Sequence, residues 1–185
     1  MPDAWDSGLR VSIRNTVDTS KIQKLAKKAA VNILVGFKSG EVHPPTIRKN
    51  EAGEDVDYNG ASAENAHGID MAELAKMLHF GTANIPARPF LDDGLNSKKD
   101  EILDALRKEA KKALDGGSAD WNKVGTKAVG AIQEFVKGDY YKTNIPNSKK
   151  TIEWKTVNGN VGDKPLIDTS LMINSLSFIV QSGSK

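Results

Sequence analysis

Alternation of apolar side chains with other residues predicts three short β-strands, at residues 8–14, 31–37 and 175–180. Successive side chains of a strand point to opposite faces, so one face of each strand should pack against a core. The apolar positions that define these faces are Leu9, Val11, Ile13, Val31, Ile33, Val35, Phe37, Leu176, Phe178 and Val180.

Apolar residues recur at three- and four-residue spacing in four segments, which predicts amphipathic helices beginning near Thr19, Ile69, Pro89 and Ser118. Their apolar stripes are Ile22, Leu25, Ala26 and Ala29; Met71, Leu74, Ala75 and Leu78; Leu91, Leu95, Ile102, Leu103, Leu106, Ala110 and Leu114; and Trp121, Val124, Ala128, Ile132, Phe135 and Val136. Glycine follows the second, third and fourth helices, at Gly81, Gly116–Gly117 and Gly138. The short link between the last two predicts an antiparallel helical hairpin.

Two stretches are less regular. Residues 38–68 are polar and rich in glycine and proline, which predicts an extended loop or a flexible hairpin, a candidate arm. Residues 151–159 alternate like a strand, but Asn147 or Ser148 could equally cap a helix that Asn158–Gly159 ends. The order of elements predicts a single α+β domain over residues 1–185, with a small, mostly antiparallel sheet packed against helices on one side.

Composition excludes several function classes. With 26 basic and 24 acidic residues the net charge is +2, which lacks the basic excess of dedicated nucleic-acid modules. The absence of cysteine excludes disulfides, thiol nucleophiles and cysteine-ligated metals. No run of 18 apolar residues predicts a membrane span.

The acidic loop DVDYNG (55–60) is the best candidate metal site. Asp55, Asp57, Asn59 and Gly60 match the first half of an EF-hand calcium loop. The bidentate glutamate is missing, because the twelfth position is Ala66 and Glu64 comes two places early. A solvated acidic loop explains the residues better.

No complete catalytic set is present. His43, His67 and His79 form no H-E-x-x-H motif, and neither G-x-S-x-G nor a phosphate-binding glycine loop occurs. His79 lies near the end of a predicted helix, where a histidine interacts favourably with the helix dipole. These motifs therefore assign a catalytic role to no residue.

Arg88 is the most distinctive side chain, because Pro86 and Pro89 restrict the backbone on both sides of it. It is either a surface arginine whose stem packs on Phe90 or the donor of a fork-like salt bridge, within the chain or between subunits. Asp168 is the first carboxylate to consider as its partner. In KPLIDTS (164–170), Asp168 or Thr169 could also cap a short helix through Ile173, with Lys164–Pro165 fixing its entry.

Residues 72–95, AELAKMLHFGTANIPARPFLDDGL, resemble the A-x-x-x-E-F-G-T-x-x-x-P-A-R-P-F-L signature of phage tail completion proteins, the Z-like minor tail or virion morphogenesis family of tailed phages. A second family stretch, S-x-x-T-I-x-x-K followed by K-P-L-I-D-T, is similar to this chain, and the family strand V-x-V-G-F resembles Ile33–Phe37. The matching residues of the second stretch are Ser148, Thr151, Ile152, Lys155, Lys164, Pro165, Leu166, Ile167, Asp168, Thr169, Leu171 and Ser175. This sequence departs from the pattern at His79, where the family has glutamate, at Ser170, where it has glycine, and in a longer linker from Thr156 to Asp163.

The resemblance implies a structural protein of the virion neck, made in the host cytoplasm, with no enzymatic activity and no cofactor. It implies a hexameric ring at the head–tail joint, bound to connector or head completion proteins and to tail terminator or tail tube proteins, with DNA only as cargo and no membrane. The residues that would carry assembly are Phe80, Gly81, Pro86, Arg88, Pro89, Phe90, Lys164, Pro165, Asp168 and Thr169.

Two alternatives remain. One is a calcium-binding or metal-dependent module that uses the 55–64 loop. The other is a DNA-binding domain that uses the basic residues of the long predicted helix, which are Lys98, Lys99, Arg107, Lys108, Lys111 and Lys112.

Overall fold

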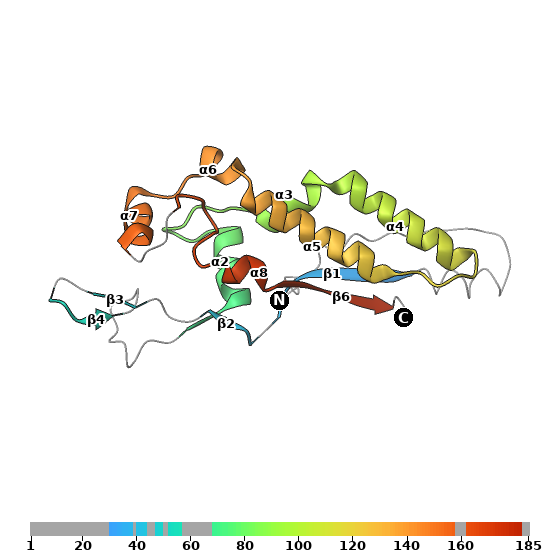
Figure 1. The fold of residues 1–185 in the computed structure, drawn as a ribbon, viewed down its shortest axis with the longest axis horizontal. Helices are drawn as coiled ribbons and strands as arrows, with labels where there is room; N and C mark the ends of the chain where they lie inside the picture. The colour runs from blue at the N-terminus through green and yellow to red at the C-terminus, as the bar shows by residue number, and fades with distance from the viewer. Residues whose placement is uncertain are drawn as a thin grey trace.

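The computed structural model describes residues 30–38, 40–43, 47–49, 52–56, 68–157 and 162–182. The predicted strand at 8–14, the predicted helix over Ile22–Ala29, His67 and most of the 55–64 loop lie outside these residues. The described elements are β1 (Val31–Phe37), β2 (Val42–His43), β3 (Arg48–Lys49), β4 (Asp55–Val56), β5 (Ile69–Asp70), α2 (Met71–Phe80), α3 (Phe90–Ser97), α4 (Lys99–Leu114), α5 (Trp121–Lys137), α6 (Tyr140–Asn144), α7 (Lys149–Val157), α8 (Leu171–Asn174) and β6 (Leu176–Ser182). They confirm an α+β fold (Figure 1).

The main sheet joins two distant parts of the sequence. β1 and β6 pair antiparallel, from Val31 opposite Ser182 to Phe37 opposite Leu176. Ile33 and Val35 pack against a buried cluster on α4 and α5, as the alternation predicts. The cross-strand pair Leu34 and Ile179 belongs to the opposite face, where Ile179 is 56% exposed.

The predicted antiparallel pairing is confirmed for β1 and β6, and the described residues also form two further sheets of two strands each. β2 pairs with β5, and β3 with β4, over two residues each. Pro44–Pro45 follow β2 directly, and proline cannot donate to a ladder. Within 38–68, the described residues therefore form short ladders, and β3 and β4 lie far from α4 and α5 (Figure 1).

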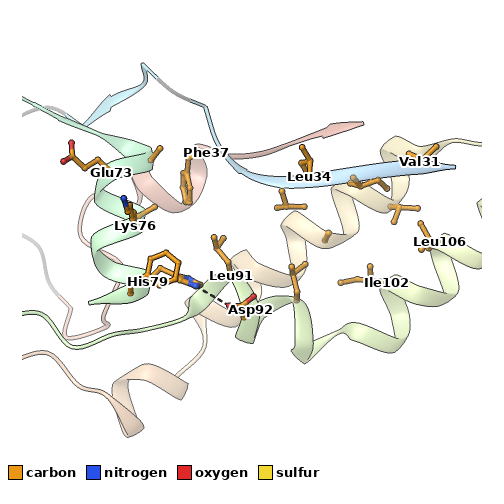
Figure 2. A pocket seen from close by; sticks show the side chains of 18 residues that line it. Val31, Leu34, Phe37, Glu73, Lys76, His79, Leu91, Asp92, Ile102 and Leu106 are labelled. Carbon is orange, nitrogen blue, oxygen red and sulfur yellow. Dashed lines mark ion pairs between the residues drawn. The ribbon is translucent and has the colours of Figure 1, made fainter. Parts of the chain in front are cut away.

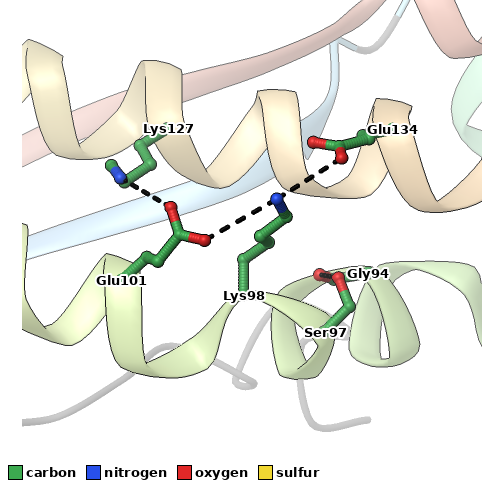
Figure 3. Close-up of polar contacts among 6 residues, drawn as sticks. All are labelled: Gly94, Ser97, Lys98, Glu101, Lys127 and Glu134. Atoms are coloured by element: carbon green, nitrogen blue, oxygen red, sulfur yellow. Dashed lines mark hydrogen bonds and ion pairs between the residues drawn. The ribbon is translucent and has the colours of Figure 1, made fainter.

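The long helix predicted from Pro89 is in fact two helices. α3 ends at Ser97, and Lys98 leaves the helical conformation with φ −124° and ψ 25°. The Ser97 hydroxyl donates to the carbonyl oxygen of Gly94 at 2.7 Å (Figure 3). Glycine and serine in the last turns weaken a helix, which explains an end here without proline. The break lets α4 run beside α5.

The α4–α5 hairpin is confirmed, and a buried carboxylate ties its two helices together (Figure 1). Glu109 is 3% exposed. It accepts the backbone N–H of Asp120 at 2.9 Å and the ammonium of Lys112 at 2.7 Å. The Asp120 hydrogen bond, followed by that of Lys112, lowers the pKa of Glu109. The end of α4 is therefore fixed to the start of α5.

A chain of charges joins α4 and α5 on the surface (Figure 3). Lys98 lies 3.6 Å from Glu101 and 3.3 Å from Glu134, and Lys127 lies 3.0 Å from Glu101. These partners raise the pKa of Lys98 and lower that of Glu101. Each exposed ion pair contributes little to stability by itself. Together, these pairs link α5 to Lys98, at the break, and to Glu101 in the first turn of α4.

The ambiguous stretch is helical: residues 149–157 form α7, and the Ser148 hydroxyl accepts the N–H of Thr151 at 3.1 Å as a helix cap does. The short helix after KPLIDTS is α8, which begins at Leu171. The Thr169 hydroxyl accepts the Leu171 N–H at 3.4 Å. No helix among the described residues combines the length and apolar character needed to cross a bilayer.

Candidate functional site

The loop after α2 is a tight corner that begins at Gly81. Gly81 has φ 76°, and a β-carbon there would lie 2.7 Å from the backbone nitrogen of Ala87. Thr82 closes the turn: its N–H donates to Ile85 O at 2.9 Å, and its hydroxyl accepts the Ile85 N–H at 3.2 Å. The Arg88 N–H then donates to Leu78 O at 3.0 Å, which returns the chain to the end of α2. The corner is thus held by its own backbone.

Arg88 is buried, with 4% of its surface exposed, so the surface interpretation is wrong. Its guanidinium does make a fork, but to carbonyl oxygens: Nε donates to Ile145 O at 3.0 Å and Nη2 to Pro146 O at 3.1 Å. Neither of these two acceptors belongs to the expected partner, Asp168. Burial lowers the pKa of Arg88, and nearby Tyr141 opposes that shift. Arg88 therefore anchors the loop between α6 and α7.

Lys155 is a second buried cation, which the sequence patterns did not single out beyond its place in the resemblance. It is 6% exposed, and its ammonium donates to Lys164 O at 2.9 Å and also to Ile167 O. Burial lowers its pKa; Asp168 opposes this, and Arg88 adds to it. Two buried cations thus hold two loops by backbone carbonyls, an arrangement that only the tertiary fold reveals.

The 164–170 stretch lies over this part of the fold. Pro165 is fully buried, and Lys164 donates to the carbonyl of Lys137 at 2.6 Å and pairs with Asp139 at 3.1 Å. Leu166 and Ser170 have φ of 63° and 61°. The family's glycine at the Ser170 position would adopt this left-handed backbone without strain. The Thr169 hydroxyl also lies 3.2 Å from Nε2 of His43.

Phe90 forms the aromatic centre of the corner and is fully buried. Its ring packs edge-to-face on Phe37 and on His79, with centroids 6.3 and 5.6 Å apart. His79 is itself 8% exposed, and its Nε2 lies 3.3 Å from Asp92. The sequence placed His79 at a helix end but did not identify its partner, the carboxylate of Asp92 in the first turn of α3.

Asp93, beside Asp92, also has a partner, because it accepts the hydroxyl of Tyr141 at 2.6 Å. Burial and this hydrogen bond raise the pKa of Tyr141 above its ordinary value. The sequence explained Asp92 and Asp93 by the helix dipole, but their side chains also connect α3 with α2 and α6.

An apolar groove of about 610 Å³ opens beside this corner (Figure 2). β1, α2, α3, α4 and α5 all contribute side chains to it. Phe80 lies on its lining and is 64% exposed, which is unusual for a phenylalanine. Among the predicted assembly residues, Phe80 is thus available for contact, whereas Arg88, Phe90 and Pro165 are buried and act on the fold.

Comparison with protein-family models, with curated proteins and with solved structures gives no match to this chain.

The structure adds little support for the two alternative functions, metal binding by the 55–64 loop and DNA binding by the basic residues of the long predicted helix. No group of three or more histidine, aspartate or glutamate side chains within the described ranges could hold a metal ion, although Asp57 and its neighbours are not among them. Of the six basic residues proposed for DNA, Lys98, Arg107 and Lys112 are each paired with a carboxylate at 3.6 Å or less. Half of the basic residues that this alternative requires are therefore paired with carboxylates.

Proposed function

We propose that this chain is a structural virion protein of a tailed bacteriophage, a tail completion component that forms a ring at the head–tail interface. The proposal begins from the sequence resemblance. One observation supports it most: the three stretches that carry the resemblance share a single core. Phe37, Ala75, Phe90, Met172 and Ile173 belong to one buried cluster, with Leu166 and Ile167 packed against it.

In this proposal the signature residues have a physical role, because they form the corner after α2. Gly81, Arg88 and Phe90 set the angle between α2 and α3, and Arg88 holds the α6–α7 loop to the same point. A ring subunit has to present fixed surfaces to two neighbours, and a rigid corner serves that need without chemistry. Phe80 projects from this corner and is our candidate contact residue.

The test is genetic and structural. The gene is disrupted alone in its phage or prophage, and the lysate is examined by electron microscopy. The proposal predicts filled heads beside separate tails, with joining restored by the wild-type protein supplied in trans. Infectious particles formed without the protein would refute it.

Complementation also tests Phe80. Phe80→Ser should fold with a melting temperature close to that of the wild type, because the ring is 64% exposed, yet fail to restore joining. The matched control is Val157→Ser, which alters an apolar side chain that is 83% exposed outside the signature and should complement fully. Equal complementation by both variants would remove Phe80 from the contact surface.

A further inference from the structure

The apolar groove runs along the outer edge of β1, which forms one of its walls (Figure 2). Five of the seven residues of β1 line the groove, whereas the described lining includes none of β6. The lining takes Leu34 from one face of the strand and Ile33 and Val35 from the other. A groove that touches both faces of one strand and leaves out its paired neighbour borders the edge that this neighbour does not occupy.

This edge of β1 is open and unprotected. Among the described residues, β1 is hydrogen-bonded to one strand, β6, on one side. In an antiparallel pair, alternate residues direct their N–H and C=O groups to the partner strand, and the remaining groups of β1 therefore face the groove. Edge strands are commonly protected by charged residues or proline, but the sequence VNILVGF contains neither. Such an edge is a template for a further strand.

The rest of the groove is shaped to receive the side chains of that strand. Leu95, Ile102 and Leu106 form the wall opposite β1, and the buried residues Val124 and Ala128 of α5 form the floor. We propose that the groove binds an extended, apolar segment of a partner protein, which pairs with β1 as an added strand. Backbone hydrogen bonds to β1 give affinity in this mode of binding, and the side chains of alternate residues fill the apolar space below. Seven residues of β1 at roughly 3.3 Å each provide about 20 Å of edge for this pairing.

Charges on the lining set where the partner segment can be polar. The charged or titratable residues are Glu73, Lys76, His79 and Asp92, and all of them lie toward α2 (Figure 2). His79 and Asp92 are paired at 3.3 Å, and Glu73 and Lys76 carry opposite charges. The other end of the groove carries no charge. The partner segment should therefore be uncharged at the end furthest from α2, and polar without a strong net charge where it reaches α2.

Other occupants satisfy the groove less completely. An aliphatic ligand, or the apolar face of a helix, would cover the side chains but leave the N–H and C=O groups of β1 without partners, which is costly once water is excluded. A second copy offers no long described strand that could enter, because its β1 and β6 pair with each other and Phe178 of β6 packs on α5 at Gly125. The partner is therefore a different protein, and this inference does not depend on the virion role.

Amide hydrogen exchange of the ¹⁵N-labelled full chain, followed by NMR, tests whether the edge is open. The β1 amides that do not pair with β6 should exchange at least about tenfold faster than the β1 amides that do. Equal protection of all β1 amides in the monomer would show that the chain covers its own edge, and would overturn the proposal. Protection that appears only as the protein concentration rises would assign the edge to a second copy and would also overturn it.

A synthetic peptide then tests strand addition. The probe is the uncharged, alternating peptide acetyl-Thr-Val-Thr-Val-Thr-Val-Thr-amide, which should slow exchange of the fast β1 amides by about tenfold or more at saturation. Two control peptides carry backbone N-methyl groups, one on every valine and the other on every threonine. Only alternate N–H groups of an added strand face β1, so one control should act like the probe and the other should lose the effect. Equal effects of all three peptides, or no effect of the probe, would overturn the proposal.

A pair of variants places the peptide in the groove. Leu106→Asp puts a charge on the uncharged end of the lining and should abolish the protection of β1 by the probe. Lys108→Asp, at an exposed position of α4 outside the lining, should leave this protection unchanged. Melting curves identify the variants that fold. A folded Leu106→Asp variant that the probe protects as well as it protects the wild type would locate the peptide elsewhere and refute strand addition in the groove.

Discussion

The crossing of α3 and α5 at Gly94 yields the sharpest stability prediction. A β-carbon added to Gly94 would lie 2.6 Å from Cα of Ile132 and 3.0 Å from its Cγ1. Carbon atoms in ordinary contact are about 3.5–4.0 Å apart, so Gly94→Ala must push the two helices apart by about 1 Å. Because the clash is with the backbone of a fully buried residue, no side-chain rotation can relieve it.

The magnitude follows from two opposing terms. Overpacking of this kind costs about 3 kcal/mol at the upper end of its usual range. Replacing glycine by alanine inside a helix returns about 1 kcal/mol. We expect Gly94→Ala to lower the free energy of unfolding by about 2 kcal/mol.

Gly130 in α5 is the matched control, because a β-carbon there meets nothing within 4 Å. Gly130→Ala should raise the free energy of unfolding by about 1 kcal/mol through helix propensity alone. The two variants should therefore differ by about 3 kcal/mol, or roughly 6–12 °C in melting temperature for a chain of this size.

Urea denaturation followed by circular dichroism measures both free energies, and an unchanged m-value shows that the transitions are comparable. The double variant Gly94→Ala/Ile132→Val should be no more stable than Gly94→Ala alone. The atom nearest to the added β-carbon is Cα of Ile132, which valine keeps. Gly94→Ala as stable as Gly130→Ala would mean that α3 and α5 are not in close contact, and the reasoning would fail.

Three further predictions concern the buried polar groups. Arg88→Lys should lower the free energy of unfolding by about 2 kcal/mol, because an ammonium on a shorter reach cannot serve both Ile145 O and Pro146 O; an unchanged urea midpoint would contradict this. The pKa of Glu109 is lowered in the folded state, so the stability that its carboxylate contributes is present above the unfolded pKa of about 4.3 and is lost as pH falls through the folded pKa. Glu109→Gln should therefore be less stable than the wild type at neutral pH. Urea denaturation should also show that this variant loses less free energy of unfolding than the wild type between neutral and acid pH. Tyr141 should stay neutral well above its ordinary pKa, so Tyr141→Phe should not reduce the phenolate absorbance that the folded protein gains at the ordinary phenol pKa; a reduced absorbance there would refute this.

Local patterns predicted the helices and strands whose apolar side chains follow a single regular spacing. The alternation in 31–37 and 175–180 identified β1 and β6, and glycine marked the ends of α2, α4 and α5. The break at Lys98 was missed because the apolar stripe continues through it from Leu95 to Ile102. The weak amphipathic character of α7 explains why its sequence resembled a strand equally well.

The candidate site was predictable only in part. The prolines around Arg88 correctly indicated a constrained guanidinium, but its acceptors are backbone carbonyls, which every residue carries and no sequence pattern marks. Lys155 was hidden for the same reason, since its acceptors are the carbonyls of Lys164 and Ile167. The partnership of His79 with Asp92 needed the corner itself, because the two residues belong to different helices.

The pairing of β1 with β6 also constrains the order in which the chain can fold. Val31 is matched with Ser182, so β1 finds its partner only after every element between the two strands has been made. Closing so long a loop is entropically costly and slow, whereas the α4–α5 hairpin needs only local contacts and can form early. A nascent chain that has not yet been extended to Ser182 would therefore carry a formed helical hairpin but an open sheet.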